Sequence, residues 1–281
     1  MSFVEDALKF HAEHNGMLAV ASKVPLNNRE DLALAYTPGV AEPCKAIKEN
    51  KELSFEYTCR GNTVAIVSDG TRVLGLGDIG PEAAMPVMEG KAVLFKTFGD
   101  VDAIPICIDT KDPEEIIETV RRLQPTFAGI NLEDFSSPKC YEIEDRLREI
   151  CDIPVFHDDQ HGTAIACLSA VMGALRYVKK DIKDVKVVVN GCGAAGSAIG
   201  RLFVSLGFPN VIMVERVGAL YKGIDAKLDK IQRYLSEVTN PNMEKGTLAE
   251  VAKDADILVG VSGPNLFTKE IIASMADKAI V

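Results

Sequence analysis

Acidic side chains follow two apolar segments, at the points where predicted strands end. The segment "FAGINLEDF" carries Glu133 and Asp134 side by side, and "IPVFHDDQHG" carries Asp158 and Asp159. Neighbouring side chains of a regular strand point to opposite faces, so adjacent carboxylates converge only where the pleat gives way to a loop. Ligands of open parallel sheets bind at the carboxyl ends of the strands. The pattern predicts that Glu133, Asp134 and one of the two later aspartates meet at that edge.

A cluster of this composition would bind a hard cation. Three carboxylates without a thiol favour Mg²⁺ or Mn²⁺. His157 and His161 argue weakly for zinc, because their spacing works best on a helix and this segment only begins one. We therefore interpret both histidines as residues that support the site or pack beside it. Helix N-capping is the competing interpretation for Asp158 or Asp159, and we expect it to hold for at least one of them.

A glycine-rich segment later in the chain could hold a phosphate. In "KVVVNGCGAAGSAIGRLF", a predicted strand leads into Gly191-x-Gly193-x-x-Gly196 and a helix, and the next strand, "VIMVE", ends at Glu215. A lone G-x-G-x-x-G is weak evidence, but this context, with an acid about 20 residues on, is what a dinucleotide site requires. Glu215 would bind ribose hydroxyls, which favours NAD, whereas Arg216 could meet the 2′-phosphate of NADP. A glycine turn without a ligand is the competing interpretation.

Alternating strands and helices must position these groups. Strands are expected near 63–70, 72–80, 103–109, 126–133, 153–156, 186–190, 211–215, 256–261 and 279–281. Helices are expected at 2–14, at 41–50, after Pro86 through 87–98, and at 113–123. Two more are expected, one after a cap at Ser137 with Pro138 as the first helical residue and one at about 162–178. This alternation predicts an α/β fold with parallel sheets covered on both faces. The polar segment 179–184 is expected to link two domains.

The composition narrows the class of protein. The net charge of -10 over 281 residues argues against nucleic acid and anionic membranes as partners, because phosphate binding requires clustered Lys and Arg. Seven cysteines without a C-x-x-C pair indicate reduced thiols in a cytoplasmic protein. The apolar runs are well short of the roughly 20 residues that span a bilayer.

Taken together, these motifs resemble the malic enzyme family in its small-subunit prokaryotic form. The resemblance covers essentially the whole chain and rests on "LALAYTPGVAEPC", "VLGLGDIGPEAAMPVMEGKAVLFKTF", "INLEDF", "VFHDDQHGTA" and "NGCGAAG". It implies an α/β substrate and metal domain at 1–180 and a Rossmann-type parallel-sheet domain that binds NAD(P) at 181–281. Because the second domain continues further in the family, we expect this chain to be incomplete at its C-terminus.

The resemblance also implies roles for individual residues. The catalytic tyrosine falls on Tyr36 in "AYTPG" and the catalytic lysine on Lys91 in "MEGKA". Arg72 falls where some relatives place an arginine for a substrate carboxylate. The implied metal ligands are Glu133, Asp134 and Asp159. The implied cofactor-binding residues are Gly191, Gly193, Ala194, Ala195, Gly196, Glu215 and Arg216.

The implied reaction is the NAD(P)-dependent oxidative decarboxylation of malate to pyruvate and CO₂, with Mg²⁺ or Mn²⁺ as a Lewis acid. Lys91 would accept the C2 hydroxyl proton, and Tyr36 would protonate the enolate. Without the resemblance, a packing aromatic and a solvated lysine would be the simpler interpretations of these two residues. A malolactic-type decarboxylase and a nucleotide-binding protein without turnover are the alternatives. We expect a homodimer or a higher homo-oligomer.

Overall fold

The computed structural model describes residues 2–73 and 75–281, and its chain divides into two compact units. The first unit runs to Phe135 and includes Ile143–Phe156, and the second unit consists of Ser136–Glu142 and His157–Val281. The helix α8 (Thr163–Val178) thus belongs to the second unit by its contacts, although the sequence-based boundary at 180 assigns it to the first domain. That boundary between functional domains stays a prediction.

A four-stranded sheet forms the centre of the first unit. Its strands are β1 (Thr63–Ser68), β2 (Asp102–Cys107), β3 (Gly129–Leu132) and β4 (Val155–His157), in the order β2-β1-β3-β4. The central strand β1 pairs in parallel with both β2 and β3. This confirms the α/β class, and it brings the carboxyl ends of these three strands to one edge of the sheet.

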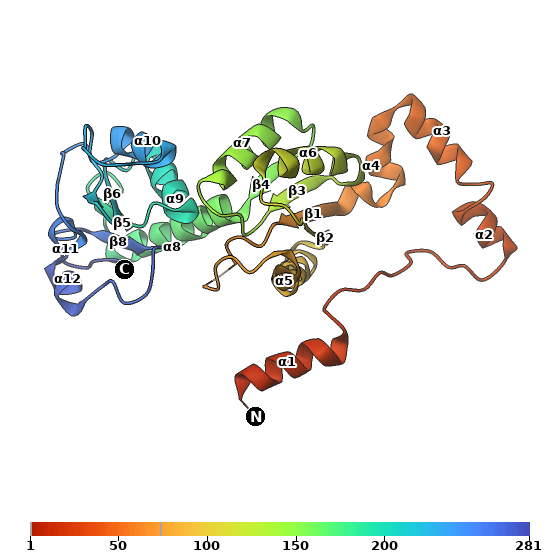
Figure 1. The fold of residues 1–281 in the computed structure, drawn as a ribbon, viewed down its shortest axis with the longest axis horizontal. Coiled ribbons are helices and arrows are strands. Elements are labelled where there is room, and N and C mark those ends of the chain that lie inside the picture. Colours follow the sequence, from red (N-terminus) through yellow and green to blue (C-terminus); the bar gives the residue numbers. More distant parts are fainter. Residues whose placement is uncertain (1, 74) are drawn as a thin grey trace. The chain divides into compact units, whose positions relative to one another are not determined.

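Helices cover both faces of this sheet (Figure 1), with α5 (Pro81–Gly99) on one face and α6 (Pro113–Leu123) on the other. Met88 and Ala92 of α5 pack against the sheet residues Ile66 and Ala103. The helix α7 (Lys139–Ile150) begins one residue after Pro138, so this proline precedes the helix and is not its first residue. The short helices η3 (Gln124–Thr126) and η4 (Asp158–Gly162) follow α6 and β4.

The chain before β1 is helical and largely exposed. It contains α1 (Phe3–His14), α2 (Arg29–Ala35), α3 (Ala41–Glu49), η1 (Lys51–Leu53), α4 (Ser54–Tyr57) and η2 (Cys59–Asn62). As predicted, α1 ends at His14, and its C-cap residue Asn15 adopts the left-handed conformation that favours a helix stop. Figure 1 shows α2 and α3 beyond α4, on the side of the sheet where β1 begins.

The second unit has its own four-stranded sheet. Its strands are β5 (Lys186–Asn190), β6 (Asn210–Glu215), β7 (Gly218–Ala219) and β8 (Ile257–Gly260), in the order β7-β6-β5-β8. The helices are α8, α9 (Ala194–Ser205), α10 (Lys230–Val238), α11 (Leu248–Val251) and α12 (Lys269–Ser274). The strand β5 is parallel to β6 and β8, and β7, which was not predicted, is antiparallel to β6.

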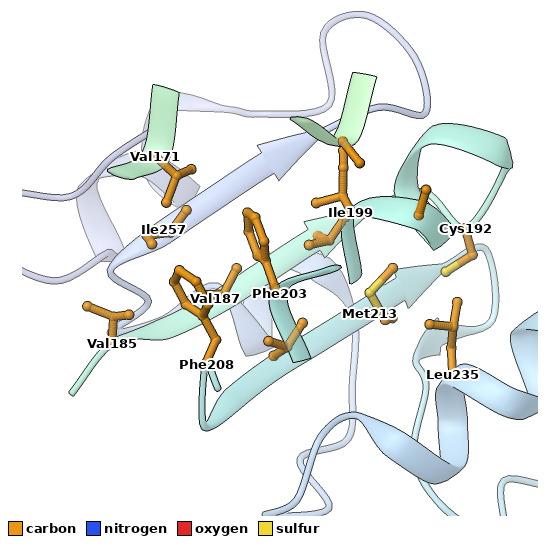
Figure 2. Close-up of a cluster of buried hydrophobic side chains, with 14 of the residues drawn as sticks. Val171, Val185, Val187, Cys192, Ile199, Phe203, Phe208, Met213, Leu235 and Ile257 are labelled. Carbon is orange, nitrogen blue, oxygen red and sulfur yellow. The ribbon is translucent and has the colours of Figure 1, made fainter. Parts of the chain in front are cut away.

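Both faces of this second sheet are buried in apolar cores. Val187 and Val189 of β5 lie in one cluster and Val188 lies in another, because successive side chains of a strand point to opposite faces. In the first cluster, shown in Figure 2, Phe203 of α9 stacks on Phe208 with ring centroids 4.8 Å apart. This packing fixes α9 against β5, and therefore fixes the loop that joins them.

Two predicted strands are wrong. Position 74 lies outside the described residues, and the described residues of 72–80 are irregular, with one isolated bridge from Val73 to Gly77. Gly77 and Gly80 have positive φ angles of 79° and 81°, which a regular strand does not accommodate. At 279–281, only Ile280 forms a bridge, to Ile257.

The start of α5 also differs from the prediction. The helix begins at Pro81, five residues before Pro86, which lies inside it. Pro81 occupies the first helical position, where the missing N–H costs nothing, whereas Pro86 lies beyond the first turn and removes one intrahelical hydrogen bond, and the helix still continues to Gly99. Within the described residues, no helix combines the length and the apolar composition needed to cross a membrane.

Candidate metal and cofactor residues

Three carboxylates gather at the ends of β3 and β4. One oxygen from each of Glu133, Asp134 and Asp159 lies within 4.8 Å of the other two. Glu133 directly follows β3, and Asp159 comes two residues after β4, the neighbour of β3 in the sheet. Glu133 and Asp134 are buried, and like charges this close require a compensating positive charge. The donor set therefore fits a hard divalent cation.

The backbone at Asp134 explains how two adjacent carboxylates reach one point. Asp134 has a φ of 58°, in the left-handed region that aspartate tolerates better than most residues. This conformation ends the alternation of β3, which the sequence could only anticipate as a break in the pleat. The carbonyl of Asp134 accepts a hydrogen bond of 2.9 Å from the backbone N–H of Arg72. The side chain of Arg72 is exposed, so its role in substrate binding stays a prediction.

Glu133 is held at both carboxylate oxygens. The Nζ of Lys91, on α5, lies 3.2 Å from Oε1 in an ion pair. The side-chain amide of Asn131, on β3, donates a hydrogen bond of 2.9 Å to Oε2. The structure thus places the implied catalytic lysine directly beside an implied metal ligand. The sequence motifs did not single out Asn131, although a polar residue two positions before Glu133 in an apolar strand is a readable signal.

The segment after β4 differs from the helix start that we expected. His157 is fully buried, and its Nδ1 lies 3.8 Å from Oδ2 of Asp159. His157 and Gly162 occupy the N-cap positions of η4 and α8, and neither makes a side-chain cap hydrogen bond. The N-cap positions thus fall on residues other than Asp158 and Asp159, and a capping role for either carboxylate stays a prediction. The supporting role of the histidines stays a prediction.

Tyr36 is not among the residues of the carboxylate cluster. It is the C-cap residue of α2, whereas Glu133 and Asp134 directly follow β3. Its side chain is 67% exposed. Nothing in the sequence motif "AYTPG" specifies this exposure, because the motif fixes the residue type and not its place in the fold.

The glycine-rich loop connects β5 to α9, as predicted. Gly191 has a φ of 114°, and a Cβ there would lie 2.9 Å from Cβ of Ser262. A Cβ on Gly196 would meet the backbone of Gly191, whereas a Cβ on Gly193 would have nothing within 4 Å. Gly191 and Gly196 therefore permit close packing, whereas Gly193 leaves open space at the start of α9. That start, with Ala194 and Ala195, offers free N–H groups to an anion, so the residues fit a pyrophosphate.

Glu215 ends β6 beside this loop. Its Oε2 accepts a hydrogen bond of 3.2 Å from the backbone N–H of Cys192, and its Oε1 accepts one of 3.0 Å from the N–H of Arg216. Burial and the nearby Glu215 raise the pKa of the Cys192 thiol far above its ordinary range. Arg216 is exposed. An acid and a base thus stand together where the adenosine ribose of a dinucleotide is usually recognised.

A side chain of α9 also holds the glycine-rich loop in place. Ser197 donates a hydrogen bond of 2.8 Å to the carbonyl of Cys192, and the hydroxyl of Tyr141 lies 3.4 Å from Oγ of Ser197. Burial raises the pKa of Tyr141, so this hydroxyl stays protonated near neutral pH.

Two family profiles match the chain. Residues 15–148 match the malic enzyme N-terminal domain, and residues 160–280 match the malic enzyme NAD binding domain. The bifunctional malic/malolactic enzyme of Bacillus subtilis is 49% identical over 281 residues, which are 100% of this chain and 68% of the relative. The NAD-dependent malic enzyme of Geobacillus stearothermophilus is 52% identical over 95% of this chain and 55% of its own length. For the NADP-dependent malic enzyme of Escherichia coli, the identity is 46%, over 99% of this chain and 36% of the relative.

The solved structures agree with these relatives. The NAD-dependent malic enzyme of Thermotoga maritima superposes with a TM-score of 0.94 at 47% identity, covering 98% of this chain and 74% of that one. The malic enzyme of Pyrococcus horikoshii gives a TM-score of 0.92 at 44% identity, over 99% and 67% of the two chains. This chain is thus shorter than each of these proteins. From the matching profiles, the identities and the fold, the chain belongs to the malic enzyme family.

Proposed function

We propose that this protein oxidatively decarboxylates malate to pyruvate and CO₂, with reduction of NAD or NADP and a requirement for Mg²⁺ or Mn²⁺. The observation that carries the proposal is the cluster of Glu133, Asp134 and Asp159 within 4.8 Å, in a chain of the malic enzyme family. The Lys91 ammonium beside Glu133 adds a proton-transfer group at the same place.

The three carboxylates would hold the divalent cation. When bound, the cation supplies Lewis-acid polarisation of malate oxygens, and the dinucleotide on the glycine loop supplies the hydride acceptor. As a neutral amine, a form that a neighbouring divalent cation would favour, Lys91 would take the proton of the C2 hydroxyl as the hydride leaves C2. Its ion pair with Glu133, at 3.2 Å, supports this assignment because it keeps Nζ at the carboxylate cluster.

Tyr36 protonates C3 of the enolate after CO₂ has left, as the resemblance implies. A proton donor in a decarboxylase has to be shielded from water, and Tyr36 is 67% exposed in one chain. The residues before it include exposed apolar side chains, among them Phe3, Leu8 and Phe10. We infer a homodimer in which a second copy covers this segment. Light scattering coupled to size-exclusion chromatography would give twice the monomer mass, and a monomer would contradict this inference.

Individual residues support a choice of cofactor and of cellular compartment. Glu215 at the end of β6 supports NAD, because a carboxylate accepts hydrogen bonds from the ribose hydroxyls and repels a 2′-phosphate. Arg216 beside it would attract a 2′-phosphate, so NADP is the second candidate. None of the seven cysteines forms a disulfide, which supports a cytoplasmic protein.

A spectrophotometric assay tests the proposed reaction. Purified protein with malate, Mn²⁺ and NAD⁺ or NADP⁺ should raise the absorbance at 340 nm, and EDTA should abolish the change. The bifunctional relative at 49% identity makes a malolactic reaction the second candidate. Lactate formed without a net gain at 340 nm would support that candidate. Cofactor binding with neither product would overturn both and leave a nucleotide-binding protein.

A further inference from the structure

Asn131 is an uncharged polar residue in the middle of a buried strand. Its side chain is 3% exposed, and it pairs in register with Ile66 of β1. Asparagine is depleted in strands, and a buried amide costs free energy unless it is hydrogen-bonded. The partner here is Glu133, whose Oε2 accepts the amide N–H at 2.9 Å.

The strand itself sets this pairing. Residues two apart in extended backbone lie on the same face, so Asn131 of β3 and Glu133, which directly follows the strand, lie side by side. Lys91 approaches the same carboxylate from α5 and takes the other oxygen, Oε1. Glu133 is therefore fixed at Oε2 by a neutral donor and at Oε1 by a cationic one.

The two donors differ in what they allow beside Glu133. An ammonium group repels a divalent cation that binds the same carboxylate, whereas a neutral amide does not. A cation at Oε1 would replace the ion pair with Lys91, and the bond from Asn131 to Oε2 would remain. The amide is thus the partner of Glu133 that is compatible with a bound metal.

We propose that Asn131 is a positioning residue for the metal site: its amide holds Oε2 of Glu133 so that Oε1 is presented to the cation. The inference rests on the proposed function, because it takes Glu133 as a ligand. Groups that orient metal ligands in this way contribute about 10- to 100-fold in metal affinity or activity.

The test is a titration of the 281-residue protein with Mn²⁺. The electron paramagnetic resonance signal of free Mn²⁺ reports how much of the metal is unbound. Asn131→Leu keeps the size of the side chain and removes the donor. We expect a loss of Mn²⁺ affinity of about tenfold or more. Turnover should recover at saturating Mn²⁺, because the ligand is still present. Asn131→Ser, a smaller change that also withdraws the amide, should show the same loss and covers the case in which the leucine variant does not fold.

Thr63→Val is the matched control. Thr63 is buried at the start of β1, and its hydroxyl donates a hydrogen bond of 2.6 Å to the carbonyl of Cys59. The substitution removes one buried hydrogen bond at the opposite end of the same sheet. It should lower the melting temperature and leave Mn²⁺ affinity unchanged, which separates a metal effect from a loss of stability.

A Glu133→Gln variant separates the role of Glu133 as a metal ligand from the role of Asn131 in positioning it. If Glu133→Gln weakens Mn²⁺ binding and the Asn131 variants bind like the wild type, the positioning role is refuted and the metal site stands. Unchanged affinity in Glu133→Gln would remove the ligand assignment and the inference with it. A loss of turnover in Asn131→Leu that saturating Mn²⁺ does not restore would also overturn the positioning role.

Discussion

Replacing the third glycine of the loop by alanine should damage the second unit severely. A Cβ on Gly196 would lie 2.8 Å from the carbonyl carbon of Gly191 and 3.0 Å from Cγ2 of Val261, and closer still to the carbonyl oxygen of Gly191. Gly191 cannot easily move away, because its N–H donates a hydrogen bond of 2.9 Å to the carbonyl of Val214. Overpacking costs about 1–3 kcal/mol, and a clash with backbone places Gly196→Ala near about 3 kcal/mol.

Gly193→Ala is the matched variant in the same loop. A Cβ at Gly193 has nothing within 4 Å, so the free energy of unfolding should stay within about 0.5 kcal/mol of the wild type. The open space is where we expect the pyrophosphate, so the added methyl group should weaken NAD⁺ binding. We expect a loss of about tenfold, since close approach of the backbone is what this glycine provides.

Urea unfolding and calorimetric titration of NAD⁺, applied to both variants, give the two readouts. Gly196→Ala should lose stability and cofactor binding together, and Gly193→Ala should lose binding alone. A Gly196→Ala variant with wild-type stability would refute the packing argument. A Gly193→Ala variant with wild-type affinity for both NAD⁺ and NADP⁺ would show that no phosphate approaches this part of the loop.

Three further predictions concern other groups. Lys91→Met should lower turnover by about 10²–10⁴ while NAD⁺ affinity is kept, and a variant within tenfold of the wild type would remove Lys91 from the base role. Asp134→Asn keeps a residue that tolerates the left-handed conformation and removes the charge. It should weaken Mn²⁺ binding by at least about tenfold at nearly unchanged stability, and equal affinity would contradict the ligand assignment. Burial raises the pKa of the Cys192 thiol, so the unfolded chain releases this proton first. The free energy of unfolding should therefore be highest below about pH 8.5 and fall above it, and Cys192→Ala should flatten the fall in urea titrations; an unchanged slope would contradict this.

The sequence predicted secondary structure well where all the determining residues lie in one short segment. The helix expected at 113–123 has those bounds, because Asp112 accepts hydrogen bonds from the backbone N–H groups of Glu114 and Glu115 and Pro113 occupies the first position. The glycine loop was predicted in the same way, since strand, turn and helix are contiguous. The meeting of carboxylates at the ends of β3 and β4 also followed, from the rule that parallel strands share an edge.

Other features depend on contacts that the sequence does not display. The segment 72–80 alternates like a strand, but glycines with positive φ fold it into a loop whose N–H at Arg72 binds Asp134. The exposure of Tyr36 depends on where the whole N-terminal segment lies. The role of Asn131 appears only when its distance to Glu133 is known, because a lone asparagine in a strand has no typical function.

The most direct test of the account is the anomalous scattering of Mn²⁺ in crystals soaked with the metal. We expect one Mn²⁺ coordinated by oxygens of Glu133, Asp134 and Asp159, at hard-cation distances of about 2.0–2.6 Å. A Mn²⁺ ion bound instead by the imidazoles of His157 and His161, or these carboxylates without metal at saturating Mn²⁺, would contradict the central claim.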